Sequence, residues 1–422
     1  MEATRIRLAE GVHLTYLPAR KFKTSLLSAQ FVTPLRRETA GANALLAAVL
    51  RRGTVSCPDM GALSAKMDNL YDASIDYTVR KKDENQCVGF VASFIDDRYA
   101  PGGERLLEPA AALLGELICD PVTYHGRFVP EYFESEKTNL LEAIRSLIND
   151  KRDWADSRLL RALCDGEAYA VPRLGDEETV DKLQALKVYT QYRDLISTAP
   201  LEIIYSGSAD LERVKQALAA AFATLPREEV RVISTAAPHV CRESVQHVED
   251  VLDVTQGKLG MGFSCGSDDM PALLMGNTLF GGSSNSKLFL NVREKLSLCY
   301  YASSLYHRQK GLITVSSGIE FQNYQRAYDE IMAQLEAVQK GELEDWELEG
   351  ARSTLLNSYA TVGDSQGKLE NFYLGQAATG QHETPADLAR AIQDMTAERI
   401  CRAMSTVKLD TVYFLKGKEA EA

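Results

Sequence analysis

The stretch Leu279–Tyr301, LFGGSSNSKLFLNVREKLSLCYY, decides how the rest of the chain is interpreted. Its glycine–serine segment, which begins with Gly281 and Gly282, predicts a break between two helices. Beyond the break, apolar residues recur every four positions, which is typical of one face of a helix. The letters LCYY at the end indicate the start of a strand. The segment is therefore predicted to be a helix, a turn, a second helix and a strand.

Two side chains of this segment offer hydrogen-bond donors. Arg293 lies near the middle of the second expected helix, and Tyr300 follows across a short turn. The forked guanidinium of arginine and the phenol of tyrosine suit peptide carbonyls and carboxylates. We expect these two side chains to project toward one point, where together they would offer donors to a peptide.

The string R-E-K-x-x-L-x-Y, preceded by the glycine-rich turn and S-x-L-F, resembles the C-terminal-half signature of the insulinase/pitrilysin superfamily. That superfamily includes the mitochondrial processing peptidases and small two-subunit bacterial zinc peptidases. The corresponding arginine and tyrosine of the superfamily lie opposite a zinc site and hold the substrate peptide. The resemblance implies this role for Arg293 and Tyr300, with Gly281 and Gly282 letting the peptide backbone approach closely.

Composition is that of an ordinary globular protein, with 45% hydrophobic and 25% charged residues in a chain of 422. The length favours two or more domains. A net charge of −12 argues against binding to nucleic acid or to an anionic membrane. No apolar run approaches the roughly 20 residues of a membrane span, and Met1–Pro18 lacks a signal-peptide pattern, so we expect a cytoplasmic protein. The eight scattered cysteines agree with a reducing compartment.

The order of expected elements repeats at an offset of roughly 205–220 residues, which indicates an internal duplication. FVASF and the helix after it match ITVSS and its following helix, and PEYFESEKTNLLEAI matches EDWELEGARSTLLNS. The prediction is an α+β protein of two duplicated domains, residues 1–226 and 250–422. Each is expected to be a mainly antiparallel sheet covered by helices on one face. Residues 227–249 lack helical periodicity, contain Pro238 and are predicted to be the linker.

The zinc-binding motif of the superfamily is missing from the place where it should occur. Active members carry H-x-x-E-H on the first buried helix, which provides two metal ligands and a general base. The corresponding helix here is Glu38–Leu50, and the three positions fall on Ala44, Ala47 and Ala48. Alanine has neither a lone pair for zinc nor a basic group.

The third family ligand is a glutamate on the long helix after Pro130, seven residues beyond an assisting glutamate. By the resemblance, the assisting position is Glu136, which is retained, and the ligand position falls on Ala143. The remaining histidines form no ligand set, because they are isolated in the sequence. We therefore expect no metal and no catalytic residue in this chain alone.

A competing motif is G-x-S-x-G at residues 262–266, where Ser264 follows an expected strand. In an α/β-hydrolase this serine would be the nucleophile, and Asp364 and His382 could complete the triad order. The flanking elements repeat those of the first half, however, and strands and helices do not alternate as in a parallel sheet. This serine-hydrolase hypothesis is the remote alternative.

The preferred hypothesis, implied by the resemblance, is a non-catalytic, substrate-binding subunit of a two-chain insulinase-like zinc metalloendopeptidase. Zinc is then expected in the partner, which would be a zinc-bearing paralogous subunit or a second copy of this chain. The substrate would be an unfolded peptide, with no nucleic acid or membrane involved. The alternative is a non-enzymatic peptide-binding or scaffold protein that works with a paralogous peptidase in a modification or secretion pathway.

Overall fold

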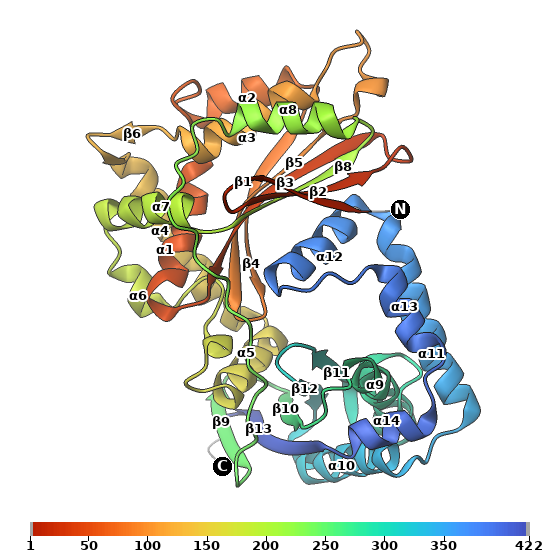
Figure 1. Ribbon diagram of the computed structural model, residues 1–422. Helices are drawn as coiled ribbons and strands as arrows, with labels where there is room; N and C mark the ends of the chain where they lie inside the picture. The colour runs from red at the N-terminus through yellow and green to blue at the C-terminus, as the bar shows by residue number, and fades with distance from the viewer. Residues whose placement is uncertain (1–2, 419–422) are drawn as a thin grey trace. The chain divides into compact units, whose positions relative to one another are not determined.

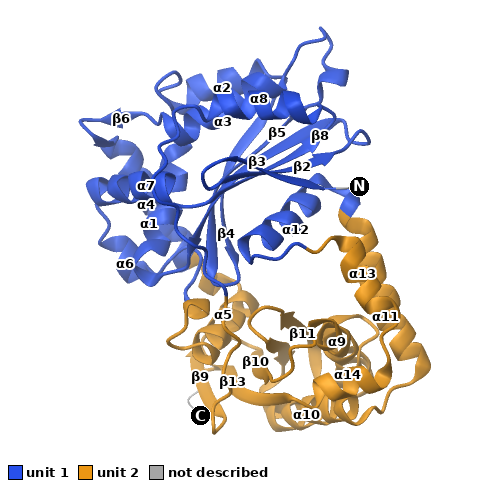
Figure 2. Cartoon of the chain, viewed as in Figure 1, with its two compact units in different colours: residues 1–145, 171–235, 363–382 blue, residues 146–170, 236–362, 383–422 orange. Residues whose placement is uncertain are grey.

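The computed structural model describes residues 3–418 (Figure 1). The chain forms two compact units, and neither is continuous in sequence (Figure 2). Unit 1 comprises residues 1–145, 171–235 and 363–382, and unit 2 comprises residues 146–170, 236–362 and 383–422. Among the described residues, no helix combines the length and the hydropathy that crossing a bilayer requires.

Unit 1 is built on a six-stranded sheet with the order β1-β2-β8-β3-β5-β4. Its strands are β1 (Thr4–Ala9), β2 (Val12–Pro18), β3 (Thr24–Pro34), β4 (Ser74–Lys82), β5 (Asn85–Ile95) and β8 (Leu201–Gly207). Its helices are α1 (Arg37–Leu50), α2 (Met60–Asp68), α3 (Leu107–Cys119), α4 (Pro130–Ser146), α6 (Glu177–Asp181), α7 (Ala185–Thr198), α8 (Leu211–Ala221) and α12 (Gln366–Ala378). A short hairpin, β6 (Thr123–Tyr124) and β7 (Arg127–Phe128), precedes α4.

Unit 2 has a five-stranded sheet with the order β11-β12-β10-β13-β9. Its strands are β9 (Gln246–Leu252), β10 (Gly257–Cys265), β11 (Cys299–His307), β12 (Leu312–Ile319) and β13 (Val407–Gly417). Its helices are α5 (Lys151–Leu163), α9 (Met270–Asn277), α10 (Tyr324–Lys340), α11 (Asp345–Ala360), α13 (Pro385–Gln393) and α14 (Ala397–Met404), with two π-helical segments, η4 (Thr278–Gly282) and η5 (Leu288–Lys295).

The two sheets share one topology, which confirms the duplicated α+β fold that the sequence predicts. The strand order β2-β8-β3-β5-β4 of unit 1 corresponds to β9-β13-β10-β12-β11 of unit 2. In each sheet the first of these pairs is parallel and the others are antiparallel. By this match, the edge strand β4 of unit 1 is the counterpart of β11, which contains Tyr300 near its start and follows the segment with Arg293.

The predicted buried helix is α1, and residues 40–50 of it are all buried. It contacts α7 and β5, so the small alanine side chains allow close packing on several sides. The core of unit 1 also takes alternate residues of β3, such as Leu27 and Ala29. The residues between them, Ser28 and Gln30, are buried as well but point to the opposite face of the sheet.

That opposite face is covered by α12, which belongs to the second half of the sequence (Figure 2). Ser28 donates a hydrogen bond to Glu370 of α12 at 2.7 Å, and Gln366 donates to the carbonyl of Ser206 at 2.7 Å. In the same way, α5 from the first half packs on the sheet of unit 2. Leu159 and Leu163 of α5 lie against glycines of β10, where a side chain would not fit without displacing them.

The compact units therefore differ from linear halves, because each half of the sequence contributes one helix to the other unit. The division between units near residue 235 falls inside the predicted linker, 227–249. Most of that segment has no regular structure, but its last four residues begin β9. Residues 227–235 belong to unit 1 and residues 236–249 to unit 2.

Candidate functional site: a vacated metal position and an exposed arginine–tyrosine pair

The positions that correspond to the zinc ligands lie together in unit 1. Ala44 and Ala48 of α1 and Ala143 of α4 line one cavity of about 730 Å³. Ala47, at the general-base position, lies in the hydrophobic core of the unit and is 1% exposed. Methyl groups offer no metal ligand, so the side chains at these positions do not fit a zinc ion.

The retained carboxylate, Glu136, also lines this cavity and is buried. Arg52, which follows α1, donates from Nη1 to Oε1 of Glu136 at 2.8 Å, and Asn139 donates to its Oε2 at 3.1 Å. The guanidinium of Arg52 also lies 4.9 Å from the ring centre of Tyr132. Burying a charged group is costly unless it is paired and hydrogen-bonded. Glu136 is therefore held in an ion pair within this chain.

Most of the charge on the cavity wall is positive. The four cations are Arg80, Lys81, Lys82 and Arg173, whereas Glu136 is the one carboxylate among the lining residues of this described cavity. Three of the cations lie in a row on β4, the edge strand of the sheet. The sequence analysis missed these residues, although the run RKK at residues 80–82 was a visible signal.

Arg293 lies on η5 in unit 2. The helix is π-helical rather than α-helical, since the N–H of Leu296 donates to the carbonyl of Asn291 five residues earlier at 3.1 Å. The guanidinium of Arg293 lies 4.7 Å from the ring centre of Phe289, and its Nε is 3.5 Å from Glu294. The side chain of Arg293 is 40% exposed, so much of its donor surface remains open to a ligand.

Tyr300 lies at a bulge at the start of the edge strand β11, where the register shifts between Cys299 and Tyr301. The residue is 60% exposed, and its hydroxyl donates to Oε1 of Glu320 at 2.7 Å. A tyrosine phenol is protonated at neutral pH, and this hydrogen bond raises the pKa of Tyr300 from its ordinary value. Tyr300 can therefore act as a hydrogen-bond donor at the surface of unit 2.

The two glycines of the predicted peptide contact have different surroundings. Gly281 is buried, and a Cβ atom there would lie 2.7 Å from Cδ1 of Leu288 and 2.8 Å from the backbone nitrogen of Ser304. Packing of η4 against β11 thus requires a glycine at this position. Gly282 is exposed, and the nearest neighbour of a Cβ atom there would be the side-chain amide of Asn277 at 2.9 Å.

Ser264 does not occupy a nucleophile elbow. It lies within β10 and is paired in antiparallel register with Leu312 of β12 and Lys408 of β13. The hydrolase motif requires a sharp turn between a strand and a helix, which exposes the serine. Ser264 is 5% exposed. The serine-hydrolase hypothesis is therefore wrong, because G-x-S-x-G here is a segment of sheet.

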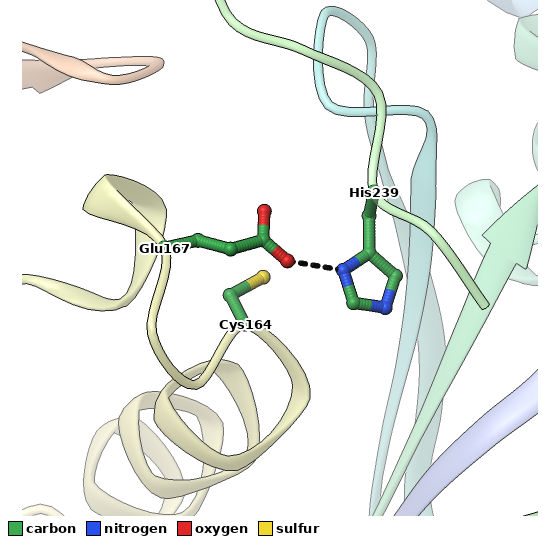
Figure 3. Close-up of side chains that lie close together, drawn as sticks. All are labelled: Cys164, Glu167 and His239. Carbon is green, nitrogen blue, oxygen red and sulfur yellow. Dashed lines mark hydrogen bonds and ion pairs between the residues drawn. The ribbon is translucent and has the colours of Figure 1, made fainter. Parts of the chain in front are cut away.

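A cluster of possible metal ligands is found in unit 2, where Cys164, Glu167 and His239 place their ligand atoms within 4.8 Å of one another (Figure 3). Nδ1 of His239 lies 2.5 Å from Oε1 of Glu167, and the buried ammonium of Lys310 pairs with the other oxygen of Glu167. Asp410 lies 3.3 Å from Nε2 of His239. The ammonium already neutralises the carboxylate, so we assign the cluster as a buried ion-pair network.

The fold and site define a class: a duplicated peptidase-like α+β protein whose metal position lacks ligands. The family model of the peptidase M16 inactive domain matches residues 182–355. A Bacillus subtilis protein named probable inactive metalloprotease YmfF is 34% identical over 416 residues, covering 97% of this chain and 96% of that protein. A second B. subtilis relative, the uncharacterized zinc protease YmxG, is 22% identical and covers 74% of this chain and 76% of its own length.

Solved structures share this fold. A conserved protein of Enterococcus faecalis V583 has a TM-score of 0.89 at 26% identity, covering 100% of both chains. A peptidase M16 inactive domain of Pseudomonas fluorescens shares the fold, with a TM-score of 0.80 at 17% identity and 100% coverage of both chains. The chain belongs to the insulinase, or M16, family of peptidases, and its similarity to a probable inactive metalloprotease and to the inactive-domain model indicates an inactive member.

Proposed function

We propose that this chain is the non-catalytic, substrate-binding subunit of a two-chain insulinase-like zinc endopeptidase. The observation that carries the proposal is a contrast between the units. The metal positions of unit 1 are alanines, whereas Arg293 and Tyr300 remain accessible at the surface of unit 2. A zinc-bearing paralogous chain would supply the metal, and this chain would supply donors to the peptide.

In this proposal, Arg293 holds a carbonyl or a carboxylate of the peptide. Tyr300 gives up its exposed hydrogen bond to Glu320 and donates to the oxygen of the scissile carbonyl, where negative charge develops. Losing one such donor typically costs ~3 kcal/mol of transition-state stabilisation, which is on the order of 100-fold in rate. The alternative is a scaffold that binds a partner peptidase and a peptide without taking part in cleavage.

The test is co-expression with a zinc-bearing paralogue from the same source, followed by cleavage assays on unfolded peptides with and without a chelator. We expect no cleavage by this chain alone and chelator-sensitive cleavage by the pair. Arg293→Ala and Tyr300→Phe should each slow the pair about 100-fold while the complex still forms in size-exclusion chromatography. Arg326→Ala, on the exposed face of α10, is the matched control and should have no effect.

Normal turnover by the Arg293→Ala and Tyr300→Phe pairs would contradict the proposal. A stable complex that cuts no faster than the zinc-bearing chain alone would instead support the scaffold alternative. Cleavage by this chain in the absence of any partner would contradict both.

A further inference from the structure

The cavity of unit 1 has a charge that is opposite to that of the whole chain. The protein carries a net charge of −12, yet four of the five charged side chains on the cavity wall are cations. The wall between them includes apolar groups, among them Ala44, Ala48 and Leu140. A cavity of about 730 Å³ is large enough for several side chains of a peptide.

The cations differ in the groups that accept their hydrogen bonds. Arg80 makes a bidentate pair with Glu370, with N–O distances of 2.6 and 2.7 Å, so its charge is matched within the unit. Lys82 instead donates to Oδ1 of Asn371 at 2.6 Å, and Arg173 donates to the carbonyl of Val79 at 3.1 Å. The hydrogen-bond acceptors of these two cations are therefore neutral groups rather than carboxylates.

The position of Lys82 makes that charge costly. Burial lowers the pKa of Lys82, which means that the ammonium form is poorly solvated where it stands. A carboxylate brought into the cavity would offset this cost and would accept hydrogen bonds from both cations. Val79, Lys82 and their neighbours lie on β4, which pairs with β5 on one side and forms the edge of the sheet on the other.

We propose that this cavity is a binding site for an acidic peptide segment, whose carboxylates are held by Lys82 and Arg173 above the apolar surface that Ala44 and Ala48 leave. The inference deepens the proposed function and rests on it only for the choice of a peptide as the ligand. The carboxylate is either an Asp or Glu side chain or the free C-terminus of the peptide. The small side chains of the alanines thus leave room in the cavity for a ligand other than a metal ion.

The experiment is fluorescence anisotropy with the purified full-length chain and three labelled, unstructured peptides of equal length. One contains glutamates and an amidated C-terminus, the second has glutamine in place of each glutamate, and the third is the glutamine peptide with a free C-terminal carboxylate. We expect the glutamate peptide to bind about tenfold tighter than the amidated glutamine peptide, with the preference falling as salt is raised. Tight binding of the third peptide would show that the carboxylate bound in the cavity is the free C-terminus of the peptide.

Variants locate the site. Lys82→Gln and Arg173→Gln should each remove most of the preference for the carboxylate, whereas Lys82→Arg should keep it. Lys215→Gln, on α8 and outside the cavity, makes the same change in net charge and should have no effect. Ala143 is exposed on the cavity wall, so Ala143→Glu should weaken binding of the glutamate peptide and Ala143→Gln should not. Thermal melts of each variant check that it is folded.

Equal affinity for the glutamate and both glutamine peptides, or no binding of any of them, would overturn the inference. So would an effect of Lys215→Gln as large as that of Lys82→Gln. None of these results depends on a partner or on cleavage. The cleavage assay with the zinc-bearing chain can therefore fail or succeed independently of the anisotropy measurement.

Discussion

Glu136 is the one carboxylate among the described residues that line the cavity of unit 1, and its charge needs a partner within the chain. Its side chain is only 11% exposed, and burying a charge without a partner is energetically costly. Arg52 supplies the partner from the end of α1, and Asn139 supplies a second donor one turn along α4. The retained glutamate is thereby explained by a local ion pair, which is a sufficient reason for its presence without a metal.

At Gly281 we predict that substitution by alanine destabilises unit 2. The new Cβ would lie within 3.0 Å of both Leu288 and the backbone of Ser304, and overpacking of this kind typically costs about 1–3 kcal/mol. Urea unfolding measures the change. Gly350→Ala on α11 is the control and should stabilise the chain. A Cβ atom there would have its nearest neighbour 3.8 Å away, and alanine is favoured over glycine in a helix interior by about 1 kcal/mol. Equal stability of the Gly281→Ala variant and the parent chain would contradict the packing argument.

At the scale of elements, the ion-pair network fixes the segment that joins the two halves of the sequence. Arg242 donates from Nη1 to the carbonyl of Leu163 at 3.0 Å and bonds Asp410 with the same group. His239 and Glu167 add a second attachment, between the segment and the turn that follows α5. The irregular chain after residue 235 is thus held against unit 2 by charged contacts rather than by regular structure.

This network predicts a loss of stability in acid. Burial opposes ionisation of Glu167, but hydrogen bonds from Lys310 and His239 outweigh it and lower the pKa of Glu167. Because the folded-state pKa lies below the unfolded value of about 4.3, the stabilisation is complete above that pH and is lost as the pH falls through the folded-state pKa. Unfolding of the parent chain and of Glu167→Gln should therefore differ at pH 6 and converge toward pH 3.

Glu212→Gln provides the control for this measurement, since Glu212 is an exposed residue of α8 whose partner is Lys215 three positions away. It should leave the free energy of unfolding nearly unchanged at every pH, because exposed pairs of this kind contribute little. A Glu167→Gln variant that stays less stable than the parent by the same amount at pH 3 and pH 6 would contradict the assignment of Glu167.

At the scale of the whole molecule, the exchange of α5 and α12 makes the halves of the sequence depend on each other. Residues 1–235 on their own lack α12, which leaves Arg80 without Glu370 and exposes Ser28 and its neighbours on the sheet. Breaking a buried pair by removing one partner typically costs about 3–5 kcal/mol, which is a large share of the stability of a domain.

We therefore predict that residues 1–235 and 236–422, expressed separately, do not unfold cooperatively, whereas the two fragments expressed together co-purify and do. A protease site inserted between residues 235 and 236 of the intact chain is the control, since cleavage there should leave the fragments associated. Calorimetry measures the unfolding transition. A fragment 1–235 that melts cooperatively by itself would show that α12 is dispensable for unit 1.

Much of the fold was predictable because its signals are local. The alanine-rich helix and the long helix after Pro130 follow from periodicity, and both are present. The repeat of elements predicted two similar sheets, and the shared strand order confirms them. The exchange of helices was missed, because the contacts of Glu370 with Ser28 and Arg80 join residues far apart in the sequence.

The sequence by itself determined the duplication, the family and the alanines at the positions that resemble the zinc motif, since each depends on which residues stand at which spacing. Only the tertiary structure decided that Ala44, Ala48 and Ala143 share a cavity with a row of cations on an edge strand. It also decided that Ser264 lies inside a sheet. The physical reason is that a motif specifies chemistry along the chain, whereas exposure, pairing and charge around a cavity depend on segments that the fold brings together.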